Sequence, residues 1–204
     1  NVEILNHGTL FWRSFSHWVG GMGVLVFVMA LVPSVCDRSI HIMRAEVPGP
    51  IVGKLVPKIK DTAKLLYLIY IAMTAVEIML LSFGEMDLFE SIVHSFGTAG
   101  TGGFGIRADS ITSYSTYSQI VITVFMLLFG VNFNLYFLLL IKRFKEVFKS
   151  SELWCYLSIF AVATALISFN INTLYGSFGE TLKNAAFQVS SVMTTTGYAT
   201  TDFD

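Results

Sequence analysis

The sequence HSFGTAGTGGFGI, residues 94–106, holds five glycines and two threonines in thirteen positions, and it lies close to long apolar runs. Glycine loses more conformational freedom on folding than any other residue, and it costs about 1 kcal/mol in a helix relative to alanine. Such a cluster therefore needs a structural reason. It is either a flexible loop or a segment whose backbone is the working surface.

The composition indicates a membrane protein. Hydrophobic residues make up 54% of the 204 positions and charged residues only 13%, whereas soluble domains have roughly 25% charged residues. The mean hydropathy is +0.66. A net charge of −1 without a basic stripe excludes a nucleic-acid partner, because nothing would neutralise the phosphates. Cys36 and Cys155 are far apart and are expected to be free thiols, and the scattered histidines predict no transition-metal site.

Four segments approach the roughly 20 apolar residues that cross a bilayer. We predict a transmembrane helix in each: about 11–33, about 64–83, about 118–141 and about 153–170. The loops after the first and third segments carry most of the lysines and arginines, which places these loops in the cytoplasm. The outer stretches are acidic and would concentrate cations.

We therefore expect a multi-pass protein of the inner (cytoplasmic) cell membrane, surrounded by membrane lipid. The chain begins with Asn1, has no cleavable signal, and stops at Asp204 soon after a turn-rich stretch. We expect it to be a slice of a longer chain.

The glycine-rich segment has a second copy. Placing Gly103 over Gly197 aligns FESIVHSFGTAGTGGFG with KNAAFQVSSVMTTTGYA. Each loop follows a short helical run, about 87–98 and about 180–193, and the same register superimposes the spans that begin near residues 62 and 156. The register also makes two further pairs, Thr101 with Thr195 and Phe104 with Tyr198. This self-similarity predicts a repeated unit of helix, re-entrant loop and helix. Ordinary turns are the alternative, but a matched pair between spans favours re-entrant loops.

Re-entrant loops of this composition predict a pore for a cation. Non-helical backbone is tolerated at membrane depth only where it is buried in protein or lines a watery cavity. Rings of backbone carbonyls can replace the water shell of a monovalent cation, and glycine allows those carbonyls to turn inward. The aromatic residue that follows can wedge the loop against the surrounding helices, and the short preceding helices point their negative C-terminal ends toward the pore. No acidic ligand is required.

Polar residues within the spans are further hypotheses for function. The segment FMLLFGVNFNLYF, residues 125–137, places Gly130, Asn132 and Asn134 in the middle of the third span. We expect a local break in the helix, and the alternative is an asparagine that bonds to a neighbouring helix. Two interpretations of Glu77 in the second span stay open. It is either a charge that snorkels outward or pairs with a polar neighbour, or a residue that couples transport to ions or protons. The segment HWVGGMG, residues 17–23, is typical of a helix face that lets two backbones approach closely.

Three motifs occur in order: FWRSFSHWVGGMGVLVF (11–27), SFGTAGTGGFG (95–105) and SSVMTTTGYATTDFD (190–204). They resemble the Trk/Ktr/HKT superfamily of potassium transporters, closest to the bacterial Trk/Ktr membrane (pore) subunits. The resemblance implies an all-α membrane protein in which four helix, pore-loop, helix repeats surround one pore, and this chain is a partial slice of it. It implies that 1–36 ends the second repeat, 37–61 is a cytoplasmic loop, 62–150 forms the third repeat, and 151–204 starts the fourth, whose closing helix is absent.

The resemblance also implies the site residues. The potassium-binding backbone of the selectivity filter would come from Thr101, Gly102, Gly103, Thr195, Thr196 and Gly197. Filter support would come from Phe104, Tyr198 and His94, with His94 expected as a hydrogen-bond partner for the loop. An intramembrane gating loop would consist of Gly130, Val131, Asn132, Phe133 and Asn134. The family's pore arginine would lie in the absent closing helix, so no residue here can carry that role.

The resemblance further implies a homodimer with a cytoplasmic nucleotide-binding regulatory subunit. No Rossmann-type signature occurs in the chain, so the nucleotide would bind the partner, and the basic cytoplasmic loops would contact it. We expect no bound cofactor, potassium as the substrate, and no enzymatic activity. The alternative is a secondary carrier for another cation or small solute, which would need paired interrupted spans. The sequence leaves open whether transport is channel-like or coupled to protons or sodium, and how strictly potassium is preferred over sodium.

Overall fold

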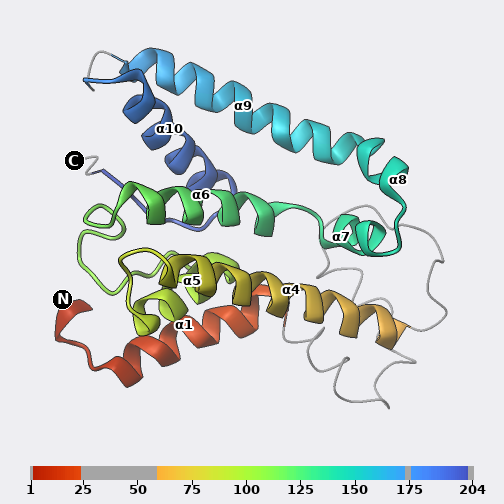
Figure 1. The fold of residues 1–204 in the computed structure, drawn as a ribbon, viewed down its shortest axis with the longest axis horizontal. Coiled ribbons are helices and arrows are strands. Elements are labelled where there is room, and N and C mark those ends of the chain that lie inside the picture. The colour runs from red at the N-terminus through yellow and green to blue at the C-terminus, as the bar shows by residue number, and fades with distance from the viewer. Residues whose placement is uncertain (1, 24–58, 173–175, 202–204) are drawn as a thin grey trace.

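The structure, a computed structural model, describes residues 2–23, 59–172 and 176–201. Every element in these ranges is a helix, which confirms the predicted all-α fold. The elements are η1 (Val2–Ile4), α1 (His7–Gly21), α4 (Ile59–Ser82), α5 (Leu88–Ala99), α6 (Thr116–Gly130), α7 (Phe133–Leu140), α8 (Phe144–Phe148), α9 (Ser151–Ile171) and α10 (Phe178–Met193), as Figure 1 shows. Cys36, residues 24–33 of the first predicted span and most of the 37–61 loop lie outside the described residues.

Two described helices are long and apolar enough to cross a membrane, α4 over Ala63–Ser82 and α9 over Ser151–Ile171. The third predicted span consists of two helices, α6 and α7, which are bent by 88° relative to each other. Val131 and Asn132 separate them. The predicted break in this span is therefore present.

The first predicted span differs from the structure. Helix α1 begins at His7 and ends at Gly21, and Gly23 takes a left-handed φ of +76°. A continuous helix over 11–33 therefore does not hold in the described residues. The physical reason is the GGMG sequence, since glycine reaches the left-handed conformation without a steric cost and commonly ends a helix.

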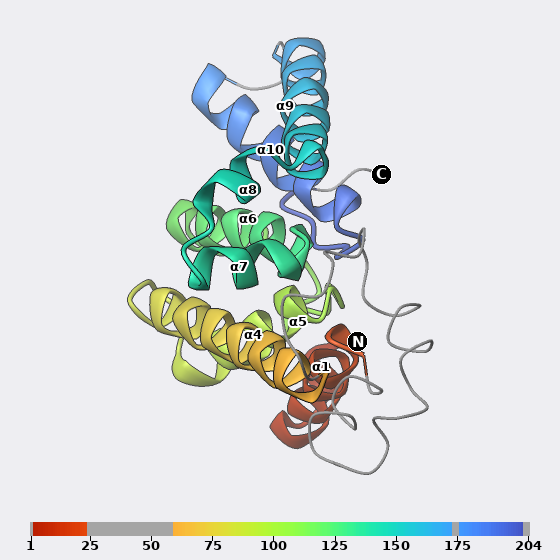
Figure 2. The same ribbon diagram turned by 90° about the vertical axis from the view of Figure 1, so that its right-hand side faces the viewer.

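Helix α6 lies between two helix pairs, α4 with α5 on one side and α9 with α10 on the other (Figures 1 and 2). Helix α5 also packs on α1. One buried cluster joins α4, α6, α10 and the segment after α10, and its members include Tyr70, Ile122, Met126, Phe187 and Tyr198. The segments that follow α5 and α10 are therefore held against a common core.

Candidate functional site

The loops after α5 and α10 have the same backbone conformation. Thr101 and Gly103 have φ values of +50° and +63°. The aligned Thr195 and Gly197 have φ values of +57° and +88°. One residue in two is thus left-handed, which costs a threonine about 1–2 kcal/mol and glycine almost nothing. The register predicted from the sequence is confirmed.

Matching hydrogen bonds fold each loop back onto its helix. They run from the amides of Gly102 and Gly103 to the Gly97 carbonyl, at 2.8 and 3.4 Å, and from the amides of Thr196 and Gly197 to the Ser191 carbonyl, at 2.8 and 3.4 Å. These bonds satisfy carbonyls at the helix ends, which have no partner within the helix. In the described part of the chain, no donor reaches the carbonyl oxygens of Thr101, Gly102, Gly103, Thr195, Thr196 or Gly197. The structure thus leaves these carbonyl oxygens free to accept another partner.

The two loops touch each other. A Cβ atom on Gly103 would lie only 2.0 Å from the carbonyl oxygen of Thr196, so the two backbones are in direct contact. Further along, the amide of Ile111 donates to the carbonyl of Ala199 at 3.1 Å. Both repeats therefore build one site.

The two aligned aromatic residues have different surroundings. Tyr198 is fully buried, and its hydroxyl donates to the backbone carbonyl of His94 at 3.2 Å. Phe104 is 41% exposed and lies near two side chains of α1, with its ring centroid 4.8 Å from that of His17 and 5.1 Å from the guanidinium carbon of Arg13. Tyr198 is thus packed inside the core, whereas Phe104 packs at the edge of the core.

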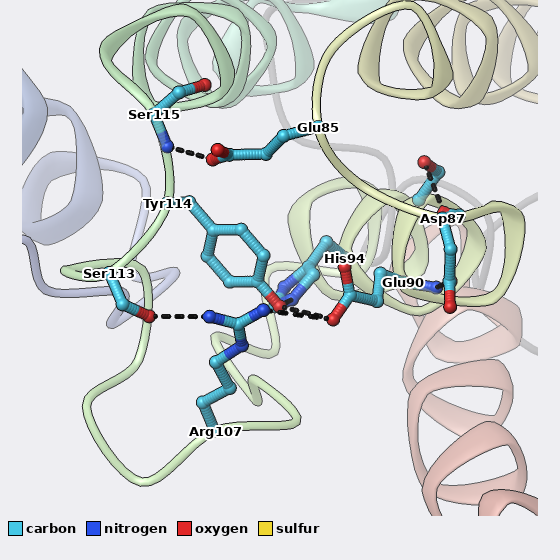
Figure 3. A network of polar contacts seen from close by, with 9 residues as sticks. Glu85, Asp87, Glu90, His94, Arg107, Ser113, Tyr114 and Ser115 are labelled. Atoms are coloured by element: carbon cyan, nitrogen blue, oxygen red, sulfur yellow. Dashed lines mark hydrogen bonds and ion pairs between the residues drawn. The ribbon is translucent and has the colours of Figure 1, made fainter.

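The imidazole of His94 bonds to a different loop from the one expected. Its Nε2 atom lies 3.2 Å from the hydroxyl of Tyr114, in the segment that precedes α6 (Figure 3). The link from His94 to the second filter loop is made by its backbone carbonyl, which accepts from Tyr198. His94 thus bonds to the loop after α10 through its backbone carbonyl, while its ring bonds to Tyr114, which is the partner of one ring nitrogen among the described residues.

An outer polar network that the sequence analysis missed surrounds this histidine (Figure 3). The carboxylate of Glu90 accepts from the Tyr114 hydroxyl at 3.2 Å and from Arg107 at 3.3 Å. The guanidinium of Arg107 also lies over the Tyr114 ring, 4.2 Å from its centroid. Burial, and then the Glu90 charge, raise the pKa of Tyr114 above its ordinary value, so the phenol stays protonated as a donor. Glu90 is therefore paired with Arg107 and Tyr114.

Helix α1 supports the first filter loop from behind. A Cβ atom on Gly21 would lie 2.9 Å from the Cα atom of Gly100, which confirms the predicted small-residue face. The guanidinium of Arg13 donates to the carbonyl of Gly105 at 2.7 Å. Gly105 is thus held to a neighbouring helix by a hydrogen bond from a charged group.

Arg13→Gln is expected to lower the thermal stability of the intact protein in detergent. The change removes a hydrogen bond from a charged group, which is worth about 1.5–3 kcal/mol, together with the contact on Phe104. Arg143→Gln is the matched control, because Arg143 makes only an exposed ion pair with Glu146 at 3.0 Å, and such pairs contribute about 0–1 kcal/mol. Equal melting temperatures for the two variants would show that this hydrogen bond from Arg13 is not important.

A cavity of about 360 Å³ joins the two Gly/Thr loops to the helix break. Its walls include three threonines of these loops, four residues at the break, and two residues of α9: Thr101, Thr194, Thr195, Gly130, Val131, Asn132, Phe133, Glu152 and Tyr156. Four of the five residues predicted for the gate therefore line the same cavity as threonines of the two Gly/Thr loops. Asn134 does not line the cavity. Its backbone N–H donates to the side-chain oxygen of Asn132 at 3.0 Å.

Contacts across the break satisfy polar groups that a continuous helix would have paired internally. The hydroxyl of Tyr156 donates to the carbonyl of Leu127 at 3.0 Å, and that of Tyr136 donates to Leu128 at 2.7 Å. The side-chain amide nitrogen of Asn132 donates to both carboxylate oxygens of Glu152, at 3.3 and 3.1 Å. Both alternatives for this segment thus hold, since the helix breaks and an asparagine bonds to a neighbouring helix.

Two residues of this region were not singled out from the sequence. Glu152 follows a basic stretch and reads there as an ordinary first-turn acid of α9. Tyr156 reads as one more apolar residue of a span. Only the alignment of the two repeats offered a signal, since it places Tyr156 opposite the start of the equivalent helix.

Glu77 is fully buried beside Thr98 of α5, so it does not snorkel outward. It does not line the cavity. The structure therefore places this carboxyl group against α5 and away from the cavity.

Comparisons with known proteins agree with this architecture. A family model described as TrkH, cation transport protein, matches residues 1–204. The chain is 34% identical over 206 residues to the Trk system potassium uptake protein TrkH of Escherichia coli (strain K12), which covers 98% of this chain and 42% of that protein. It is 29% identical to the Trk system potassium uptake protein TrkG of the same strain, covering 100% of this chain and 43% of that protein.

A solved structure has a similar fold. The crystal structure of the potassium transporter TrkH from Vibrio parahaemolyticus matches with a TM-score of 0.78 and 27% identity, covering 98% of this chain and 41% of that one. The chain thus spans less than half the length of these relatives. Because the family model matches over residues 1–204 and a relative is 34% identical, the chain belongs to the TrkH family of cation transport proteins.

Proposed function

We propose that this chain forms part of a potassium-uptake pore in the cytoplasmic membrane, in which the two Gly/Thr loops bind the dehydrated ion through backbone carbonyls. The observation that carries the proposal is the pair of matching loops, with left-handed residues at alternate positions and carbonyl oxygens that accept no protein donor among the described residues. Carbonyl oxygens arranged in this way can replace the water shell of a monovalent cation. Potassium is favoured because the relatives are named as potassium uptake proteins.

The proposal includes a gate at the helix break, residues 130–134. Its support is the shared cavity, since Gly130, Val131, Asn132 and Phe133 line it together with the loop threonines. A small movement of Val131 or Phe133 would change the width of the path below the filter. A bistable element at this place can control conduction without altering the ion-binding backbone.

We also propose a homodimer whose gate is controlled by a cytoplasmic nucleotide-binding subunit. The support for the contact is the segment around α8, which combines positive charge with exposed aromatic side chains. Phe144 and Phe148 are 51% and 65% exposed there. Aromatic side chains and arginine are enriched in protein interfaces.

Glu77→Gln is expected to leave the preference for potassium over sodium unchanged to within about twofold, because neutral carbonyls bind the ion and this carboxyl group lies outside the cavity. The measurement is potassium and sodium uptake by the intact protein in proteoliposomes. A wild-type protein that does not distinguish the two ions would contradict the proposed filter. Loss of potassium binding in Glu77→Gln, with intact binding in filter-loop variants, would assign the ion site to a carboxylate instead.

A further inference from the structure

Among the described residues, the cavity below the proposed filter has one acidic side chain in its lining, which the proposed filter and gate do not use. Glu152, in the first turn of α9, lines it together with filter-loop threonines and the helix break. Its carboxylate is only partly buried, and both of its oxygens accept from the amide of Asn132. The asparagine thus holds the charged group at the cavity wall.

Nothing in the described part of the chain neutralises this charge through an ion pair. The ion pairs found there join Arg107 to Glu90 and Arg143 to Glu146, although four basic residues lie between positions 142 and 149. An amide donor and the positive end of a helix reduce the cost of a partly buried carboxylate but do not cancel its charge. A cation in the cavity would supply the missing counter-charge.

The size of the cavity decides how such a cation would be held. At about 30 Å³ for each water molecule, 360 Å³ corresponds to about twelve waters, so a potassium ion there can keep its first water shell. The carboxylate would then act on a hydrated ion through space and not as a direct ligand.

We propose that Glu152 supplies the fixed negative charge of an inner chamber that concentrates hydrated monovalent cations below the filter, and that Asn132 positions it. This inference rests on the proposed function, since it assumes that ions pass between the filter loops and the break. Clefts lined by one sign of charge raise the local counter-ion concentration, and salt screens the effect.

Single-channel conductance of the intact protein in planar bilayers tests the inference. Glu152→Gln keeps the acceptor for Asn132 and removes the charge. Its potassium conductance is expected to fall about threefold to tenfold at about 0.01 M salt, where the screening length is about 30 Å, and to match wild type at about 1 M, where it is about 3 Å. Glu152→Asp keeps the charge and is expected to retain most of the conductance at both concentrations.

The matched control is Glu146→Gln on α8. This acid is also in the basic stretch, but it is exposed and already paired with Arg143. The conductance of the Glu146→Gln variant is therefore expected to equal that of wild type. Asn132→Ala keeps the charge and frees it to turn away, and is expected to give a smaller loss at low salt. This second variant tests the proposal even if Glu152→Gln does not fold.

Two results would overturn the inner chamber: wild-type conductance of Glu152→Gln at low salt, or a loss that is equal at both salt concentrations. The ratio of potassium to sodium permeability, read from the reversal potential in the same bilayers, reports on the filter separately. A wild-type protein without selectivity overturns the proposed function. A selective protein whose conductance ignores Glu152 overturns only this inference.

Discussion

Gly103→Ala is expected to reduce potassium uptake by more than about 100-fold and to remove the preference for potassium over sodium. The added Cβ would lie 2.0 Å from the carbonyl oxygen and 2.8 Å from the carbonyl carbon of Thr196. Both are backbone atoms of the opposite filter loop, so no side-chain rotation relieves the clash. The left-handed φ of +63° adds strain. Separation of the loops would destroy the carbonyl geometry that selects the ion.

Two other glycines provide graded controls for this experiment. Gly197 has a φ of +88° but open space around a Cβ, so Gly197→Ala carries only the backbone strain of about 1–2 kcal/mol, an intermediate effect of about tenfold. Gly105→Ala would place its Cβ 3.4 Å from the nearest atom, in ordinary contact, and should transport nearly as wild type. The measurement is rubidium and sodium uptake by purified variants with equal expression. Unchanged selectivity in a folded Gly103→Ala protein would remove this loop from the filter.

Gly130→Ala is expected to reduce uptake by roughly tenfold to hundredfold, in line with an overpacking cost of about 1–3 kcal/mol. The new Cβ would lie 2.4 Å from the Tyr156 hydroxyl and 2.9 Å from the Cγ2 atom of Thr194. Thr194 cannot move freely, because its hydroxyl bonds to the Ser190 carbonyl at 2.7 Å and to the Thr196 hydroxyl at 2.8 Å. Crowding at the break is therefore transmitted to the filter.

The double variant Gly130→Ala, Tyr156→Phe separates crowding at the break from general misfolding. Tyr156→Phe removes the nearer clashing atom, so it should restore part of the uptake lost in Gly130→Ala. Gly20→Ala is the control for adding a methyl group to a helix, since nothing lies within 4 Å of that position. Additive losses in the double variant, measured as initial rates of rubidium uptake, would show that Gly130 and Tyr156 do not interact.

Much of the fold follows from local sequence patterns. The apolar length of α9, predicted over about 153–170, is observed as Ser151–Ile171, and the pore helix predicted over about 87–98 is observed as Leu88–Ala99. These elements could be predicted because apolar run length, capping residues such as Asp87 and glycine clusters act within one segment. The end of α1 was not predicted because the apolar run is long enough for a membrane span. The glycine pair Gly20 and Gly21, at which the helix ends, lies within that run.

The sequence by itself determined the helical class, the two Gly/Thr loops and their register, since apolar run length and self-similarity are properties of the chain alone. Only the tertiary structure decided that Gly103 meets Thr196, that the break lies in one cavity with the filter, and that Asn132 holds Glu152 there. It also decided that Tyr198 is buried while its counterpart Phe104 is exposed. The physical reason is that these contacts join segments from different repeats, so each depends on how α1, α6 and α9 pack, and no local pattern specifies that packing.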